Sequence, residues 1–130
     1  MILFVEDNTR DRLLIQSILS QWEHKERITF VIDGPQAVSY LRECSNLPSV
    51  VIIDLHLPQL SGLELVKALR ANSDYYSLPI VVFSSSSSPL DIENCYRAGT
   101  NAYVIKSIDF TQFSKSVKHI VDFWVYTNTK

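Results

Sequence analysis

Acidic, hydroxyl and cationic side chains follow four short apolar segments of the chain, and together they could act on a phosphoryl group. They are Glu6 and Asp7 after residues 2–5, Asp54 after residues 50–53, Ser84 after residues 80–83 and Lys106 after residues 102–105. Three carboxylates that meet in space repel one another and raise each other's pKa unless a cation compensates them. An all-oxygen set of ligands with room for water suits Mg²⁺, so these acids predict a hard divalent metal site.

A carboxylate beside a bound metal can act as a nucleophile toward phosphorus, and we expect Asp54 to take this role. Phosphoryl transfer requires positioning of the donor and neutralisation of charge on the phosphoryl oxygens. The ammonium of Lys106 and the hydroxyl of Ser84 can contribute to that neutralisation. These residue types therefore predict the formation of an aspartyl phosphate.

The four groups can converge only if the apolar segments are parallel strands of one sheet. Strands are predicted at residues 2–5, 28–32, 50–53, 80–83 and 102–105, and helical patterns alternate with them. The helices begin at residues suited to helix starts, namely Asn8, Pro35, Ser61, Pro89 and Asp109. Strict alternation predicts one doubly wound α/β domain over residues 1–130, with helices on both faces of a parallel sheet. Ligands of such sheets bind beyond the carboxyl ends of the strands.

The last two helices show apolar stripes that we expect to face the core. In the helix after Pro89 the stripe consists of Ile92, Cys95 and Tyr96. In the helix after Asp109 it consists of Phe110, Phe113, Val117, Ile120, Val121 and Trp124.

Composition excludes several functional classes. Hydrophobic types make up 46% of the 130 residues, which is enough for a core, and the longest apolar run is five residues, too short to cross a membrane. Because of this short run and the lack of a secretory signal pattern, we expect a cytoplasmic protein. The formal net charge is −2 with no basic stripe, so we expect the protein to bind no nucleic acid. The three glycines form neither a dinucleotide-binding fingerprint nor a P-loop. Cys44 and Cys95 are expected to be reduced thiols.

Across nearly its whole length, the chain resembles the receiver domain of two-component response regulators. The motifs are Phe4-Val5-Glu6-Asp7-Asn8, Ile53-Asp54-Leu55-His56-Leu57-Pro58 followed by Gly62, Phe83-Ser84-Ser85 and Tyr103-Val104-Ile105-Lys106. The resemblance implies a flavodoxin-like strand order 2-1-3-4-5. It also implies that Asp54 accepts a phosphoryl group from a sensor histidine kinase.

The resemblance further implies a ligand set and a switch. Mg²⁺ would be held by Asp7, Asp54 and the backbone carbonyl of His56, with Glu6 acting through water. On phosphorylation Ser84 would approach the phosphoryl group and Tyr103 would change rotamer, which alters the surface formed by the fourth helix, fifth strand and fifth helix. The protein would promote only its own phosphorylation and dephosphorylation and would be no enzyme in the wider sense.

Within the family, the chain resembles most the stand-alone regulators of phytochrome kinases, as the Asp122-Phe123-Trp124 motif near its end and the expected lack of an output domain suggest. A phytochrome is therefore a candidate partner. Phe123 and Tyr126 make the last helix apolar over more than one face, which favours a homodimer through the surface just described.

Departures from the family pattern leave alternatives open. Ser107 stands where the family usually has a cis-proline, and since a cis bond without proline costs about 3–4 kcal/mol, we predict a trans Lys106–Ser107 bond. One alternative function is a receiver-like interaction module that is not phosphorylated. Another is a phosphatase of the haloacid dehalogenase type, but it requires an acid where His56 stands. His24 and His119 are predicted to be solvated and without a role, and packing is the default role for Tyr103.

Overall fold

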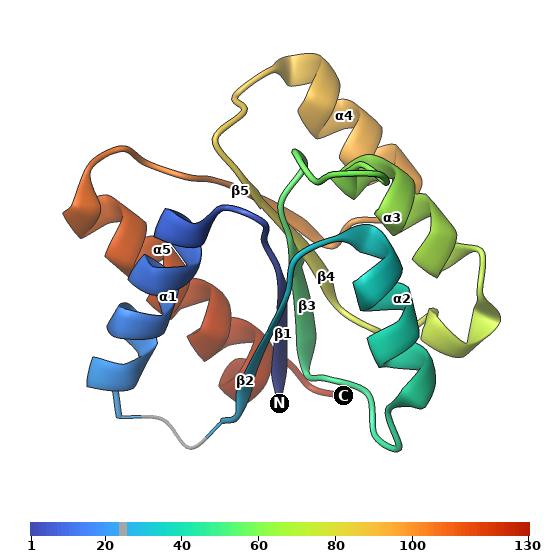
Figure 1. The fold of residues 1–130 in the computed structure, drawn as a ribbon, viewed down its shortest axis with the longest axis horizontal. Helices are drawn as coiled ribbons and strands as arrows, with labels where there is room; N and C mark the ends of the chain where they lie inside the picture. Colours follow the sequence, from blue (N-terminus) through green and yellow to red (C-terminus); the bar gives the residue numbers. More distant parts are fainter. Residues whose placement is uncertain (24–25) are drawn as a thin grey trace.

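A five-stranded parallel sheet forms the centre of the molecule, as a computed structural model describing residues 1–23 and 26–130 shows (Figure 1). The strands are β1 (Ile2–Val5), β2 (Ile28–Val31), β3 (Val50–Ile53), β4 (Ile80–Ser84) and β5 (Ala102–Ile105). Their order is β2-β1-β3-β4-β5, and every neighbouring pair is parallel. The predicted fold and strand order are therefore confirmed.

The helices cover both faces of this sheet. They are α1 (Thr9–Gln21), α2 (Gly34–Glu43), α3 (Gly62–Arg70), α4 (Pro89–Ala98) and α5 (Phe110–Val121). Helices α1 and α5 lie together on one face, and α2, α3 and α4 lie on the other (Figure 1). A 3-10 turn, Ser73–Tyr75, lies between α3 and β4, and a π-helical segment, Asp122–Thr127, extends α5.

Side-chain alternation along the strands divides the core into two layers. Leu3, Val5, Val51 and Ile53 face α2, α3 and α4, whereas Ile2, Phe4, Val50 and Ile52 face α1 and α5. Because β1 and β3 are buried on both faces, they consist entirely of apolar residues. These central strands carry the acidic residues at their carboxyl ends.

Side-chain caps begin the helices where the residue types predict them. The Asn8 carboxamide accepts from the backbone N–H of Asp11 at 2.9 Å, and Ser61 with Glu64 forms a reciprocal capping box at α3. Asp109 caps α5. Helix α2 begins one residue earlier than predicted, because Asp33 caps it and Pro35 occupies its first turn.

Two of the residues predicted to face the core are exposed instead. Tyr96 is 49% exposed, and its hydroxyl accepts a hydrogen bond from the backbone N–H of Tyr103 on the edge strand β5. Phe110 is 58% exposed in the first turn of α5, where it borders a surface pocket near Lys106. Helical periodicity places both on an inward stripe, but it does not show where the sheet beneath them ends.

The remaining predictions about the fold concern the termini of elements and the thiols. Strand β2 ends at Val31 rather than at residue 32, and β4 includes Ser84. Cys44 is half-buried, Cys95 is buried and both are free.

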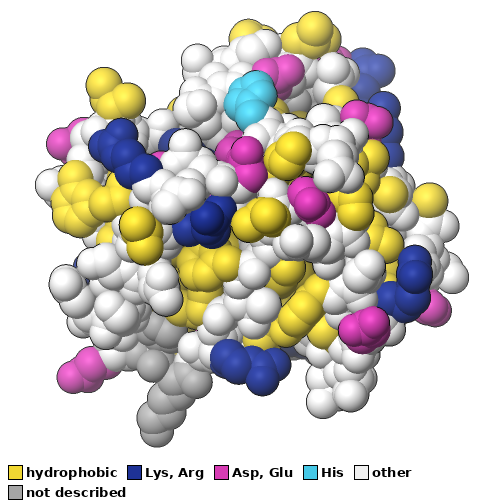
Figure 2. Space-filling model, in the orientation of Figure 1, with side chains coloured by type: hydrophobic (Ala, Val, Ile, Leu, Met, Phe, Trp, Pro, Cys, Tyr) yellow, Lys and Arg dark blue, Asp and Glu magenta, His cyan; other side chains and the backbone are white. Residues whose placement is uncertain are grey.

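Among the described residues no helix is long and apolar enough to span a bilayer. Lys and Arg lie in several separate places on the face that Figure 2 shows.

Candidate functional site

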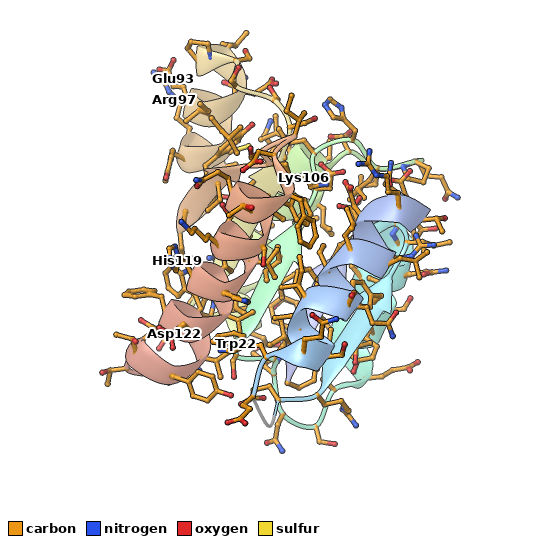
Figure 3. The ribbon with its side chains drawn as sticks, turned by 90° about the vertical axis from the view of Figure 1, so that its left-hand side faces the viewer. Trp22, Glu93, Arg97, Lys106, His119 and Asp122 are labelled. Carbon is orange, nitrogen blue, oxygen red and sulfur yellow. The ribbon has the colours of Figure 1, made fainter. Side chains whose placement is uncertain are left out.

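The backbone brings the predicted site residues to one edge of the sheet. The N–H of Glu6 donates to the carbonyl of Val31, that of Asp54 to Val5, and that of Lys106 to Ser84, at 2.9, 3.1 and 2.7 Å. Each bond continues the parallel ladder one residue beyond a strand, so the three side chains emerge at the carboxyl ends of β1, β3 and β5. Figure 3 shows Lys106 toward one end of the molecule, whereas Trp22, which follows the last residue of α1, lies toward the other end.

Lys106 is the electrostatic centre of this edge. Its ammonium lies 2.5 Å from Glu6 Oε1, 2.8 Å from Asp11 Oδ2 and 3.4 Å from Asp54 Oδ2. The lysine side chain is only 7% exposed, and its Nζ lies 5.6 Å from the centre of the Phe83 ring. A buried ammonium requires charged or polar partners, and these carboxylates supply them.

Burial and charge act in opposite directions on the two most enclosed groups. Desolvation raises the pKa of Glu6 to about 7, against the opposing effect of Lys106. Burial works to lower the pKa of Lys106, but the charge of Glu6, a hydrogen bond to Asp11 and the charge of Asp54 raise it overall. The lysine therefore stays cationic, while Glu6 binds a proton more readily than an exposed glutamate.

Glu6, Asp7 and Asp54 form a cluster of carboxylates that could hold a metal ion. One oxygen from each residue lies within 4.8 Å of the others, and Asp7 is open to solvent. An all-oxygen, partly hydrated set of ligands fits a hard divalent cation. His56 is exposed in the turn after Asp54, and the role of its backbone carbonyl stays a prediction.

The turn after Asp54 leaves no room for a side chain at Gly62. The N–H of Gly62 donates to the carbonyl of Leu55 at 2.9 Å, and a Cβ atom on Gly62 would lie 2.2 Å from the carbonyl oxygen of Asp54. Gln59 takes a positive φ of 68° in the same turn. The start of α3 thus packs directly against the backbone that carries Asp54.

Ser84 lies at the same edge, but the hydrogen bond of its hydroxyl is within its own loop. Ser84 is fully buried, and its Oγ accepts from the N–H of Ser86 at 3.2 Å. The Ser86 hydroxyl in turn donates to Asp91, and its carbonyl accepts from the Tyr103 hydroxyl at 2.8 Å. Burial raises the pKa of Tyr103. A continuous set of hydrogen bonds thus joins the two predicted switch residues, Ser84 and Tyr103.

Asp11 also belongs to the site, although no sequence pattern predicted it there. It lies in the first turn of α1, and its contact with Lys106 joins residues 95 positions apart. The available signal was the Asn8 cap, which starts a helix at the same edge and puts Asp11 in its first turn.

The structure also tests the predictions for the Lys106–Ser107 peptide bond and for His119. The Lys106–Ser107 peptide bond is trans, as predicted. His119 is exposed on α5, as expected (Figure 3). His24 lies outside the described residues.

Comparisons with known proteins agree with this architecture. The model of the response regulator receiver domain family matches residues 2–118. Response regulator Rcp1 from Synechocystis sp. is 31% identical, over 99% of this chain and 91% of its own length. A probable methanogenesis regulatory protein, FilR2, from Methanothrix harundinacea is also 31% identical, over 98% of this chain and 85% of its own length.

Solved structures extend the likeness to three dimensions. The phosphorylated cyanobacterial phytochrome response regulator RcpA superposes with a TM-score of 0.91 and 33% identity, over 98% of this chain and 95% of that one. The Mn²⁺-bound form of Rcp1 superposes with a TM-score of 0.89 and 30% identity, over 98% and 96%. The family match, these likenesses and the acidic cluster beside Lys106 lead to one conclusion: the chain belongs to the response regulator receiver domain family.

Proposed function

We propose that this receiver accepts a phosphoryl group on Asp54 from a phosphohistidine of a sensor histidine kinase. The observation that carries the proposal is the position of the Lys106 ammonium, 3.4 Å from Asp54 Oδ2 at the edge where the Glu6–Asp7–Asp54 cluster opens to solvent. An attacking carboxylate, a fixed cation and a set of oxygen ligands are the groups that phosphoryl transfer to an aspartate requires.

In the proposed step, a carboxylate oxygen of Asp54 forms a bond to phosphorus as the bond between phosphorus and the kinase histidine nitrogen breaks. The electron pair of the broken bond stays on the imidazole. Lys106 donates a hydrogen bond to the phosphoryl oxygens and offsets their charge. A Mg²⁺ ion, held by Asp7 and Asp54 with Glu6 acting through water, would supply further charge neutralisation.

The added negative charge is proposed to alter the loop between β4 and α4. Ser84 would turn its hydroxyl from Ser86 toward the phosphoryl group, which disturbs the hydrogen bond between Ser86 and Tyr103. Tyr103 lies on β5, so the change would reach the surface formed by α4, β5 and α5. This mechanism is a two-state element biased by a local charge.

A phytochrome kinase is the proposed partner, because RcpA, which superposes on this chain with a TM-score of 0.91, is a cyanobacterial phytochrome response regulator. Its site of action is proposed to be the cytoplasm.

Exposed apolar side chains on the surface formed by α4, β5 and α5, among them Leu90, Tyr96 and Ile105, favour a homodimer through that surface. Sedimentation with and without a phosphoryl mimic tests the dimer, and a monomer at high micromolar concentration in both conditions would rule it out.

The decisive experiment is incubation with Mg²⁺ and a small acyl phosphate donor, followed by intact mass measurement. We expect the wild type to gain the mass of one phosphoryl group and Asp54→Asn to gain none. Asp74→Asn, which changes an exposed acid in the 3-10 turn, is the matched control and should behave as the wild type does. No gain in the wild type, from this donor or from a histidine kinase, would favour an interaction module that is not phosphorylated.

A further inference from the structure

Asp11 contacts the lysine of the site without belonging to the acidic cluster. Its Oδ2 accepts from Lys106 Nζ at 2.8 Å, which is closer than the 3.4 Å to Asp54. Among the described residues, the carboxylates close enough to share a metal are those of Glu6, Asp7 and Asp54. The contact of Asp11 is therefore directed at the cation of the site and not at its metal ligands.

The backbone fixes Asp11 in this position. Its N–H donates to the Asn8 side chain, which starts α1, and its own side chain is 22% exposed. Asp11 and Lys106 border the same surface pocket, together with Arg10, Ser107 and Phe110. The first turn of α1 thus presents a carboxylate to Lys106 from a different element than the strands that carry Glu6 and Asp54.

The ammonium of Lys106 is already fully engaged in this arrangement. An ammonium has three N–H donors, and three carboxylates surround Nζ. Glu6 and Asp11 are the two nearer partners, so they draw the cation away from Asp54. Asp11 also carries a negative charge that opposes the arrival of an anionic phosphoryl group, and Glu6 adds to this repulsion when it is ionised.

This inference rests on the function proposed above. We propose that Asp11 is a positioning residue, which keeps the Lys106 ammonium away from Asp54 and so weakens the interaction of the lysine with a phosphoryl group on Asp54. Removal of the Asp11 charge leaves the lysine freer to interact with an anion at Asp54. Asparagine is the informative substitution, because its side-chain oxygen keeps an acceptor near Lys106 while the charge is lost.

The test is a calorimetric titration of the Mg²⁺-saturated protein with beryllofluoride, which mimics a phosphoryl group on a carboxylate. We expect Asp11→Asn to bind beryllofluoride about three- to tenfold more tightly than the wild type, as for the loss of one partly buried opposing charge. Asp11→Glu keeps the charge and should bind as the wild type does. Glu43→Gln removes an equal charge at the end of α2 and should have no effect.

A second titration, with Mg²⁺ alone, separates positioning from a merely structural role. Loss of a nearby negative charge cannot strengthen the binding of a cation, so Asp11→Asn should bind Mg²⁺ no more tightly than the wild type. Damage to the site would instead weaken the binding of both ligands. Equal or weaker beryllofluoride binding by Asp11→Asn overturns the proposal for Asp11 alone, provided that the wild type binds. Absence of binding in the wild type would overturn this proposal together with the proposed function.

Discussion

Lys106 Nζ lies 3.4 Å from Asp54 Oδ2, although 52 residues separate the two along the chain. The contact is the longest of the three that the ammonium makes with carboxylates, and Glu6 and Asp11 lie nearer. Asp54 is therefore the least compensated of the three acids around Lys106. A carboxylate with little charge compensation is suited to form a new bond. The same lack of compensation lowers the stability of the unliganded protein.

Asp54→Asn is expected to stabilise the protein by about 1 kcal/mol in the absence of divalent metal. The substitution removes the repulsion between Asp54 and the buried Glu6, while Lys106 keeps its two nearer partners. Urea unfolding in the presence of a chelator measures the difference. Saturating Mg²⁺ should diminish or reverse the difference, since the ion would compensate the wild-type carboxylates. A variant that is less stable than the wild type without metal would contradict this account.

Mg²⁺ is expected to raise the free energy of unfolding of the wild type, because the ion binds the folded cluster alone. At a concentration of 100 times Kd the gain is about 2.7 kcal/mol. Asp7→Asn should lose most of this gain, since Asp7 is the exposed member of the cluster. Asp74→Asn is the control and should keep it. An unchanged response of Asp7→Asn to Mg²⁺, measured by thermal unfolding, would exclude Asp7 as a ligand.

Gly62→Ala is expected to destabilise the protein by about 1–3 kcal/mol and to reduce phosphorylation. The new Cβ atom would lie 2.2 Å from the Asp54 carbonyl oxygen, so the backbone that carries Asp54 has to shift. Gly34→Ala is the matched control: its Cβ atom would crowd Leu60, including the Leu60 Cβ atom at 2.8 Å, so this variant should also lose stability, but the nearest atoms it meets do not belong to the Asp54 backbone and phosphorylation should stay intact. Urea unfolding and intact mass after treatment with an acyl phosphate give the two measurements. Normal phosphorylation of Gly62→Ala would show that the site tolerates the shift.

The sheet and its acidic edge could be predicted from sequence because short-range patterns determine them. Residues 50–53 are apolar and β-branched, which indicates a strand buried on both faces, and the next residue must emerge at its end. The caps at Asn8 and Ser61 are equally local. In contrast, the exposure of Tyr96 depends on the position of β5, and the contact of Asp11 with Lys106 depends on how α1 packs. Neither is encoded within a few residues of the side chain concerned.

Arg70→Ala is expected to destabilise the protein by about 2–4 kcal/mol while leaving phosphorylation intact. The Arg70 guanidinium donates to the carbonyls of Gly99, Tyr75 and Leu78 and to the Asn101 side chain, at 2.7–2.9 Å. It therefore joins α3 to the segments that lead into β4 and β5, and its removal leaves several acceptors unsatisfied. Burial lowers the pKa of this arginine.

The control for Arg70→Ala is Arg97→Ala, which removes an arginine whose ion pair with Glu93 lies exposed on α4 (Figure 3). An exposed pair at this helical spacing contributes only about 0.3–0.5 kcal/mol. Urea unfolding should therefore separate the two variants clearly. Similar losses in both would mean that the Arg70 hydrogen bonds contribute no more than a surface ion pair.

Tyr103→Phe tests the link between the β4–α4 loop and β5. The substitution keeps the ring but removes the hydroxyl that donates to the Ser86 carbonyl at 2.8 Å. A hydrogen bond of this kind contributes about 1 kcal/mol, so the loop should open about fivefold more often. The N–H groups of Ser86 and Ser88 are bonded to the Ser84 and Ser86 hydroxyls, and their hydrogen exchange reports that opening.

Tyr76→Phe is the matched control, since Tyr76 is 82% exposed and lies just after the 3-10 turn, so exchange at Ser86 and Ser88 should stay at the wild-type rate. Faster exchange in Tyr103→Phe alone would show that the tyrosine hydroxyl stabilises the loop whose Ser86 N–H donates to the Ser84 hydroxyl. A phosphoryl mimic at Asp54 that draws Ser84 away should then accelerate exchange in the wild type as the substitution does. If Tyr103→Phe leaves the two exchange rates unchanged, the ring acts by packing alone and the hydroxyl has no part in the switch.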